Sequence, residues 1–220
     1  VVKDSCGFLV NRILLGYVNE AGRLFEEGAD IEIVDKLMTD FGLPMGPFTL
    51  SDEVGLDVGI KVLHILENAF GKRFKPVEVF DQIFKAGFLG KKTEKGFYIH
   101  TPRNKFPNSA VGAMRTTSEK RPFNAEKSRQ RMLYIMINEA ARCLEEGVVD
   151  DPGAVDMGMI MGTGFPPFRG GLLRYADSVG SDQIVRSLRE LKTELGAERF
   201  EPCRYLVNLA DKKTGFYSTP

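Results

Sequence analysis

The sequence predicts an all-α fold made of two copies of one helical unit. Apolar residues recur at the i, i+3, i+4, i+7 spacing of helices along much of the chain, and no segment shows a convincing strand alternation. Short motifs of the first half also recur, in the same order, in the second half. We therefore expect a tandem duplication whose copies pack about a pseudo-two-fold axis, as the protomers of an isologous dimer do.

Composition narrows the class of protein. Of the 220 residues, 43% are apolar, which is enough for a core, and 30 basic residues balance 30 acidic ones. A balanced charge argues against nucleic acid or an anionic membrane as partner, and no apolar run approaches the ~20 residues of a membrane span. Three cysteines without a CxxC pair (Cys6, Cys143 and Cys203) favour reduced thiols in the cytoplasm over a disulfide framework or a metal site. Because Val1 is not methionine, we expect a piece of a longer protein.

The first half is predicted to contain five helices, over about 7–27, 31–41, 47–52, 57–70 and 76–87. The residues that begin or end them are, in chain order, Asp4 or Ser5, Gly28, Asp30, Gly42 and Pro47. Residues 101–124 are rich in proline and polar side chains and are predicted to be a linker. Helices follow over about 125–146, 152–162, 171–179, 181–195 and 202–210. The predicted domains are thus a first repeat (1–100), the linker (101–124) and a second, degenerate repeat (125–220).

Three motifs carry the repeat, each at an offset of 119 residues (138 − 19 for the first). They are Asn19-Glu20-Ala21 and Asn138-Glu139-Ala140, Glu26-Glu27-Gly28 and Glu145-Glu146-Gly147, and Gly96-Phe97-Tyr98 and Gly215-Phe216-Tyr217. A fourth pair, Asp52–Gly55 and Asp177–Gly180, follows at an offset of 125. Four matches in one order indicate duplication.

Asn11 is the leading candidate for a functional residue. It lies in the apolar run Gly7-Phe8-Leu9-Val10-Asn11-Arg12, where an amide either pairs within the protein or faces a ligand. The second copy has Gln130 at the equivalent position, followed by Arg131 as Asn11 is followed by Arg12. A structural role common to both copies would favour the same residue, so the difference indicates that Asn11 acts in one copy only.

The chain resembles the C-terminal region of L-3-hydroxyacyl-CoA dehydrogenases. The resemblance rests on Asp4, the run from Gly7 to Arg12, Pro44-Met45-Gly46-Pro47-Phe48, Asp52, Val54-Gly55-Leu56-Asp57, and Gly90-Lys91-Lys92 through Gly96-Phe97-Tyr98. The doubled unit, with Gly164-Phe165-Pro166-Pro167-Phe168-Arg169-Gly170-Gly171 in its second copy, looks most like the α-subunit of the multifunctional fatty-acid β-oxidation complex.

The resemblance implies a fold like the C-terminal domain of 6-phosphogluconate dehydrogenase, and a share in NAD-dependent oxidation of (S)-3-hydroxyacyl-CoA to 3-oxoacyl-CoA. In this family an asparagine matching Asn11 reaches the thioester and hydroxyl region of the substrate, and in the multifunctional α-subunits a tyrosine matching Tyr175 also contacts the substrate. Tyr175 is equally well explained as an aromatic on the inner face of a short helix. An N-terminal Rossmann domain carries NAD and the catalytic histidine and glutamate, and an enoyl-CoA hydratase domain and a thiolase subunit are the other expected partners.

The sequence lacks a G-x-G-x-x-G motif and a histidine flanked like the family's base, since neither His64 nor His100 fits. The fragment alone is therefore expected to be inactive and to bind no NAD. Lys91, Lys92 and Lys95 could face CoA phosphates, although a solvated loop is the more usual explanation. Cys6 has no activating base nearby. The glutamates at 26, 27, 145 and 146 are interpreted as surface charge, and Met157, Met159 and Met161 as core.

Two functional classes remain open. The chain is either the substrate-binding half of a dehydrogenase or chiefly an assembly module that docks partner subunits such as thiolase. The two hypotheses predict different effects of replacing Asn11.

Overall fold

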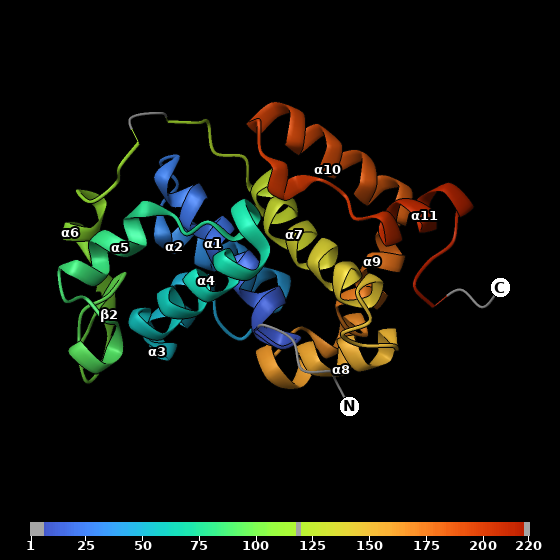
Figure 1. Ribbon diagram of the computed structural model, residues 1–220. Helices are drawn as coiled ribbons and strands as arrows, with labels where there is room; N and C mark the ends of the chain where they lie inside the picture. Colours follow the sequence, from blue (N-terminus) through green and yellow to red (C-terminus); the bar gives the residue numbers. More distant parts are fainter. Residues whose placement is uncertain (1–6, 118–119, 218–220) are drawn as a thin grey trace. The chain divides into compact units, whose positions relative to one another are not determined.

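The structure is a computed structural model that describes residues 7–117 and 120–217. The described part is mostly helical, which confirms the all-α prediction (Figure 1). It divides into two compact units, which we call the split unit (residues 1–16 and 130–220) and the continuous unit (residues 17–129). The division falls inside helices α1 (Val10–Glu26) and α7 (Ala125–Glu145), so each of these helices supplies residues to both units. The predicted caps Asp4 and Ser5, and Cys6, lie outside the described residues.

The continuous unit contains the predicted helices of the first copy. After α1 they are α2 (Ile31–Phe41), α3 (Pro47–Val54), α4 (Leu56–Phe70) and α5 (Glu78–Lys85), with single 3₁₀ turns at Gly71–Phe74 and Lys91–Thr93. The first helix begins later than predicted. Gly7 and Phe8 have φ angles of 75° and 49°, so the backbone there is left-handed, and helical geometry starts only at Val10.

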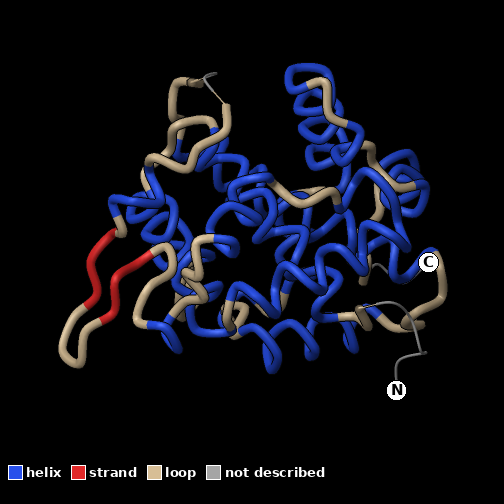
Figure 2. The backbone as a smooth tube through the Cα atoms, turned by 60° about the vertical axis from the view of Figure 1, so that its left-hand side comes forward, coloured by secondary structure: helices blue, strands red, loops and turns tan. Residues whose placement is uncertain are grey.

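A two-stranded hairpin also belongs to this unit. Strands β1 (Tyr98–His100) and β2 (Lys105–Pro107) pair antiparallel, with Tyr98 opposite Pro107, and protrude as a narrow loop (Figure 2). The predicted linker therefore contains a strand and also a short helix, α6 (Ser109–Gly112). Strands of three residues are too short to show a recognisable alternation, which explains why the sequence pattern did not reveal them.

The split unit contains the helices of the second copy. They are the rest of α7, then α8 (Pro152–Thr163), α9 (Leu172–Val179), α10 (Ser181–Leu195) and α11 (Arg204–Lys212), with 3₁₀ turns at Pro167–Arg169 and Glu198–Phe200. Equivalent helices of the two copies have equivalent caps. Asp30 accepts a hydrogen bond from the Glu32 amide at the start of α2, and Asp151 accepts one from the Ala154 amide at the start of α8.

Buried aspartates hold the first copy together. Asp35, on α2, accepts hydrogen bonds from the backbone N–H groups of Phe48 (2.8 Å) and Thr49 (3.0 Å) at the start of α3. These amides have no partner within their own helix, so the carboxylate acts as a cap supplied by a neighbouring helix. Asp52, on α3, does the same for the strand-forming segment, accepting from the amides of Phe97 and Tyr98 at 2.9 Å each.

The second copy repeats both arrangements. Asp156, on α8, accepts hydrogen bonds from the amides of Leu173 (2.6 Å) and Arg174 (3.1 Å) at the start of α9. Asp177, on α9, accepts from the amides of Phe216 (2.7 Å) and Tyr217 (3.0 Å). The recurring Gly-Phe-Tyr motif is thus the segment that an aspartate holds in each copy, and this aspartate is buried in the first copy and half-buried in the second.

The glycine of that motif is required by the closeness of the carboxylate. A Cβ atom built at Gly96 would lie 2.0 Å from Oδ1 of Asp52, and one at Gly215 would lie 2.5 Å from Cγ of Asp177. Any side chain at either position would therefore push the carboxylate away from the amides it caps. Phe97 in turn is the centre of an aromatic cluster, packing against Phe48 at 4.5 Å and Phe80 at 5.9 Å between ring centroids.

Hydrogen bonds of the asparagine explain why the Asn-Glu-Ala motif recurs at residues 19–21 and 138–140. The side chain of Asn19 donates to the carbonyl of Lys75 (2.9 Å) and accepts from the amide of Val77 (3.1 Å). Asn138 donates to the carbonyl of Glu201 (2.8 Å) and accepts from the amide of Cys203 (2.8 Å). In each copy one asparagine fixes the chain just before a later helix by satisfying both a backbone donor and a backbone acceptor.

We expect the substitution Gly96→Ala to lower the free energy of unfolding by about 3 kcal/mol, because the new methyl group overlaps Asp52. Gly59, inside α4, is the matched control, since a Cβ there meets no atom within 4 Å. Gly59→Ala should raise stability by about 0.5–1 kcal/mol. Urea denaturation of both variants measures the difference, and equal effects would contradict the close packing at Gly96.

Stability should also fall at alkaline pH. The hydroxyl of Tyr98 donates to Asp35 (2.9 Å) and that of Tyr217 to Asp156 (2.7 Å). Burial, and then the adjacent carboxylate, raise the pKa of both phenols above the ordinary value of 10.0. The unfolded phenols lose their protons first as the pH rises, so this stability is complete below pH 10 and decreases above it. Urea midpoints at pH 8 and pH 11 should show a smaller loss in the double variant Tyr98→Phe, Tyr217→Phe than in the unmodified chain.

Candidate functional site

Asn11 lies in the first turn of α1 and is exposed. The residues around it, Leu9, Arg12 and Ile13, are 3%, 0% and 0% exposed. The carboxamide of Asn11 has no hydrogen-bond partner within the part of the chain that the structure describes. An exposed amide without a protein partner can both donate and accept a hydrogen bond to a bound molecule. The geometry therefore leaves Asn11 available to a ligand, and its role stays a prediction.

Arg12, the next residue, is held by two glutamates of the second copy. Its Nε donates to Oε1 of Glu139 at 2.5 Å, and its two terminal nitrogens donate to Glu146 at 2.7 and 3.0 Å. The second contact is a two-pronged pairing of the guanidinium with a carboxylate. Burial alone would lower the pKa of Arg12, but the hydrogen bond to Glu146 and the charge of Glu139 raise that pKa, so the side chain stays charged. We call these three residues the arginine clamp.

Helix α8 packs closely against the same end of α1. A Cβ atom at Gly162 would lie 2.9 Å from Cγ1 of Val10, and one at Gly158 would lie 3.5 Å from Leu9 and from Val10. Two glycines one turn apart thus let the side chains of the α1 turn rest on the α8 backbone. The equivalent positions in α2 are Leu37 and Phe41, at an offset of 121 residues (158 − 37), so this approach belongs to the second copy.

The exposed side of α8 corrects one prediction. Met157, Met159 and Met161 were all expected in the core, but only Met159 is buried, while Met157 and Met161 are 60% and 78% exposed. In the first copy the equivalent positions, again 121 residues earlier, are Lys36 and Asp40, which form an exposed ion pair at 2.7 Å. Where the first copy has a solvated ion pair, the second copy thus has two exposed apolar side chains, Met157 and Met161, which we call the methionine ridge.

Tyr175 lies on α9 and is half-buried. Its ring lies 6.4 Å from that of Phe165, which directly follows the end of α8, and the guanidinium carbon of Arg169 lies 5.5 Å from the ring centroid. Tyr175 and Asn11 thus belong to the split unit, with α8 contacting the turn that carries Asn11 and Phe165 contacting Tyr175. No direct hydrogen bond joins Asn11 and Tyr175 in the described residues.

The lysines of the glycine-rich loop belong to the continuous unit. Lys91 pairs with Glu53 at 2.8 Å, and Lys92 pairs with Asp57. Two of the three cationic groups thus already have acidic partners on exposed surface, an arrangement that favours a solvated loop over a phosphate site. Lys95 is exposed.

The two histidines have different surroundings. His64 is exposed and lies 3.4 Å from Asp81. His100 is half-buried, and its Nε2 lies 2.8 Å from Asp52. Burial raises the pKa of Asp52, and the hydrogen bond from His100 partly opposes this. Because Asp52 also caps two backbone amides, the pair is explained by the packing of the β1 segment.

Sequence reasoning missed the arginine clamp. The glutamates at 26, 27, 145 and 146 were interpreted as surface charge, but Glu26 is buried, accepting hydrogen bonds from the amides of Thr116 and Thr117, and Glu146 binds Arg12. One signal was present: Arg12 interrupts an apolar run and recurs as Arg131 in the second copy. A buried arginine requires an acidic partner.

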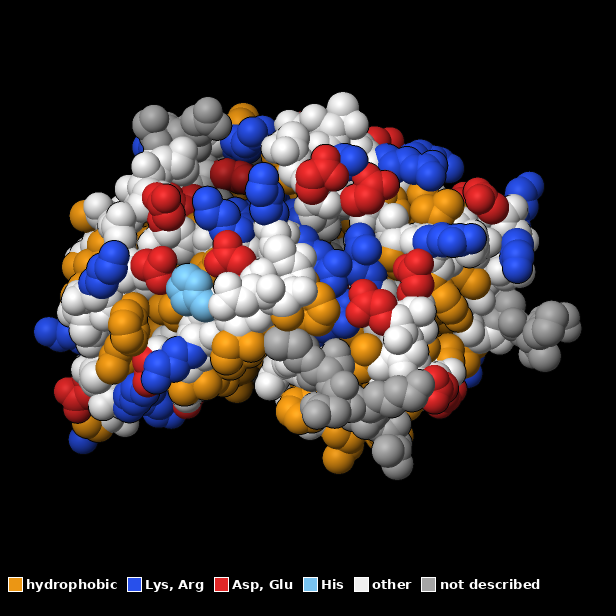
Figure 3. Space-filling view, viewed as in Figure 1, with side chains coloured by type: hydrophobic (Ala, Val, Ile, Leu, Met, Phe, Trp, Pro, Cys, Tyr) orange, Lys and Arg blue, Asp and Glu red, His pale blue; other side chains and the backbone are white. Residues whose placement is uncertain are grey.

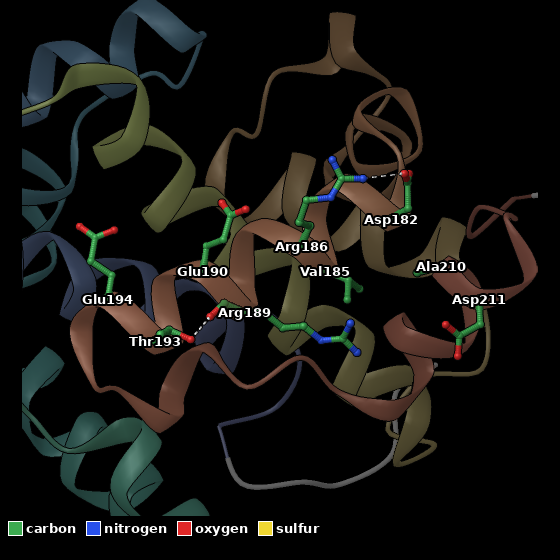
Figure 4. Close-up of a pocket in the computed structure, with 9 residues that line it drawn as sticks. All are labelled: Asp182, Val185, Arg186, Arg189, Glu190, Thr193, Glu194, Ala210 and Asp211. Atoms are coloured by element: carbon green, nitrogen blue, oxygen red, sulfur yellow. Dashed lines mark hydrogen bonds and ion pairs between the residues drawn. The ribbon is translucent and has the colours of Figure 1, made fainter.

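An open groove of about 620 Å³ lies elsewhere in the split unit, between α10 and α11. It is lined by Asp182, Val185, Arg186, Arg189, Glu190, Thr193, Glu194, Ala210 and Asp211. Arg189 and Val185 point toward α11, whereas Glu190 and Glu194 point away from it (Figure 4). Charges of both signs line this groove, as they do the visible face of the molecule (Figure 3), and neither Asn11 nor Tyr175 reaches it.

The described residues do not form a dinucleotide site of the Rossmann type. A dinucleotide site of the Rossmann type needs a parallel sheet with a glycine-rich turn into a helix, and the described strands are one antiparallel pair. No cluster of three or more potential metal ligands occurs in the described segments. Among the helices of residues 7–117 and 120–217, none has the length and apolar character needed to span a bilayer.

Comparison with known proteins agrees with this arrangement. Residues 7–100 and 129–216 both match the family described as 3-hydroxyacyl-CoA dehydrogenase, C-terminal domain. A match in two segments fits a tandem repeat of one helical unit. Proteins named fatty acid oxidation complex subunit alpha, from Shewanella sp. (strain MR-4) and Shewanella loihica, are each 43% identical to this chain over 99% of its length. The chain spans 31% of the length of each.

Solved structures support the fold. The crystal structure of 3-hydroxybutyryl-CoA dehydrogenase from Escherichia coli K12 has a TM-score of 0.80 and 23% identity, and covers 96% of this chain and 61% of its own. The dehydrogenase part of multifunctional enzyme 1 from C. elegans has a TM-score of 0.70 and 26% identity, and covers 93% of this chain and 48% of its own.

Proposed function

Because this chain belongs to the family of 3-hydroxyacyl-CoA dehydrogenase C-terminal domains, we propose that it is the substrate-facing helical part of an NAD-dependent 3-hydroxyacyl-CoA dehydrogenase. The full-length protein then oxidises (S)-3-hydroxyacyl-CoA to 3-oxoacyl-CoA in fatty-acid β-oxidation. Its NAD site, its catalytic histidine and glutamate and an enoyl-CoA hydratase domain lie in parts of the protein beyond these 220 residues. The domains proposed here are a first repeat at 1–100, a connecting segment at 101–124 and a second repeat at 125–220, acting in the cytoplasm.

The observation that carries the proposal is the exposed amide of Asn11, which has no hydrogen-bond partner among the described residues. A carboxamide can donate a hydrogen bond to a thioester carbonyl and accept one from a hydroxyl, and it keeps both abilities at any ordinary pH. It thus suits a substrate that carries a carbonyl and a hydroxyl close together. A fixed donor at an oxygen that gains negative charge is worth about 3–4 kcal/mol of the barrier.

Tyr175 is proposed to contact the same substrate. Its ring packs on Phe165 while its residue remains half-exposed, and the nearby guanidinium of Arg169 adds positive charge. A phenol combines an apolar ring, which can pack on the protein, with a polar hydroxyl group. The hydroxyl group can hydrogen-bond a bound acyl-CoA.

We expect Asn11→Ala in the full-length protein to lower kcat/KM for 3-hydroxyacyl-CoA about 10²-fold, because a transition-state donor is lost. Tyr175→Phe should raise KM several-fold with a smaller change in kcat, because it removes one hydrogen bond. Reduction of NAD, followed by absorbance, measures both effects. The isolated 220-residue chain should show no turnover in the same assay.

Gln130→Ala is the matched control, since Gln130 occupies the position of Asn11 in the second copy. Its turnover should stay within about twofold of the unmodified protein, because the second copy carries no substrate amide. Unchanged turnover in Asn11→Ala would refute the role of Asn11. Unchanged KM in Tyr175→Phe would leave Tyr175 as a packing residue.

The methionine ridge favours a second function, docking of a partner subunit such as thiolase. Exposed apolar side chains in place of an ion pair are typical of an interaction surface, and methionine adapts to varied partners. Replacing Met157 by Lys and Met161 by Asp restores the pair found in the first copy, which is compatible with an exposed helix face. In the full-length protein this variant should lose subunit association in analytical ultracentrifugation and keep its turnover. Intact association would exclude the ridge as a docking surface.

A further inference from the structure

We propose that Arg12 is the positioning residue for Asn11, and that the second copy contributes to catalysis by holding Arg12 through Glu139 and Glu146. This inference rests on the proposed role of Asn11. It assigns a task to the degenerate copy, which has no substrate asparagine of its own.

The turn that carries Asn11 has little support from backbone hydrogen bonds. Helix α1 starts at Val10, so Asn11 is only its second residue. The first turn of a helix has unpaired backbone donors and is the part that opens most readily. The residues just before it, Gly7 and Phe8, are in left-handed conformation and add no helical support. The position of the carboxamide therefore depends on side-chain contacts.

The arginine clamp holds Arg12 firmly and in one direction. Arg12 is 0% exposed, and its hydrogen bonds to Glu139 and Glu146 are charge-assisted, at 2.5 Å to the first and 2.7 and 3.0 Å to the second. Adjacent residues of a helix point about 100° apart. Fixing Arg12 toward α7 therefore fixes the rotation of the turn about its axis, and with it the direction in which Asn11 points.

The second copy has an equivalent arginine in a different position within its helix. Arg131 follows Gln130 as Arg12 follows Asn11, and it is also buried, at 5% exposed. Helix α7 begins at Ala125, so five helical residues precede Gln130, and this part of the helix is supported by its own backbone hydrogen bonds. Of the two equivalent arginines, Arg131 thus lies in the interior of its helix, whereas Arg12 lies at the end of its helix. Only at the end does it control an exposed amide.

The test uses the full-length protein and the substitutions Arg12→Lys and Arg131→Lys. Lysine keeps the positive charge beside the glutamates but cannot form the planar two-pronged contact. We expect Arg12→Lys to lower kcat about tenfold with little change in KM, because an ångström of misplacement is enough for such a loss. Arg131→Lys should leave kcat within twofold. Similar melting temperatures of the two variants would show that the difference is not one of overall stability.

A double variant separates positioning from a general structural effect. If Arg12 acts through Asn11, then Arg12→Lys should cause no further loss of kcat in the Asn11→Ala background. Multiplied losses in the double variant, or an equal loss in Arg131→Lys, would overturn the inference. If Asn11→Ala alone keeps full activity, the proposed role of Asn11 fails and this inference fails with it. If Asn11→Ala loses activity but Arg12→Lys does not, only this inference fails.

Discussion

Aspartate carboxylates that accept hydrogen bonds from backbone amides are the interaction on which both copies depend. Asp35 and Asp156 cap the helix that follows the central turn, and Asp52 and Asp177 hold the Gly-Phe-Tyr segment. A buried charge is costly unless it is fully hydrogen-bonded. The three buried ones, Asp35, Asp52 and Asp156, meet that condition with donors that would otherwise lack partners, so the two needs are satisfied together.

This constraint explains which residues the duplication preserved. A glycine opposes each carboxylate because nothing larger fits: a Cβ at Gly46 would lie 2.4 Å from Oδ1 of Asp35, and one at Gly171 would lie 2.3 Å from Cγ of Asp156. The residues that face outward were free to change. The ion pair of Lys36 and Asp40 in the first copy and the methionine ridge in the second occupy equivalent positions, and neither takes part in these contacts.

The sequence predicted most of the fold, because helices longer than two turns show their period and their caps directly. Asp30, Gly42 and Pro47 mark the boundaries that the structure has. It did not reveal the hairpin near Tyr98, whose strands are too short for a period, nor the burial of Glu26, whose partners lie about 90 residues away. The candidate site was predicted only in part. Asn11 could be named from its neighbours in the sequence, but the arginine clamp depends on contacts between distant parts of the chain, which no local pattern encodes.

The division of α1 and α7 between the two units has a consequence for how the chain is made. The split unit needs residues from both ends of the sequence, so its contacts cannot form until the second copy has been synthesised. Until then, the start of α1 has apolar residues such as Leu9 and Ile13 without the helices that later cover them. Contacts across so long a separation form slowly, and exposed apolar segments of partly folded chains are prone to aggregate. In a duplicated fold of this kind, the contacts of the split unit therefore form only late in translation.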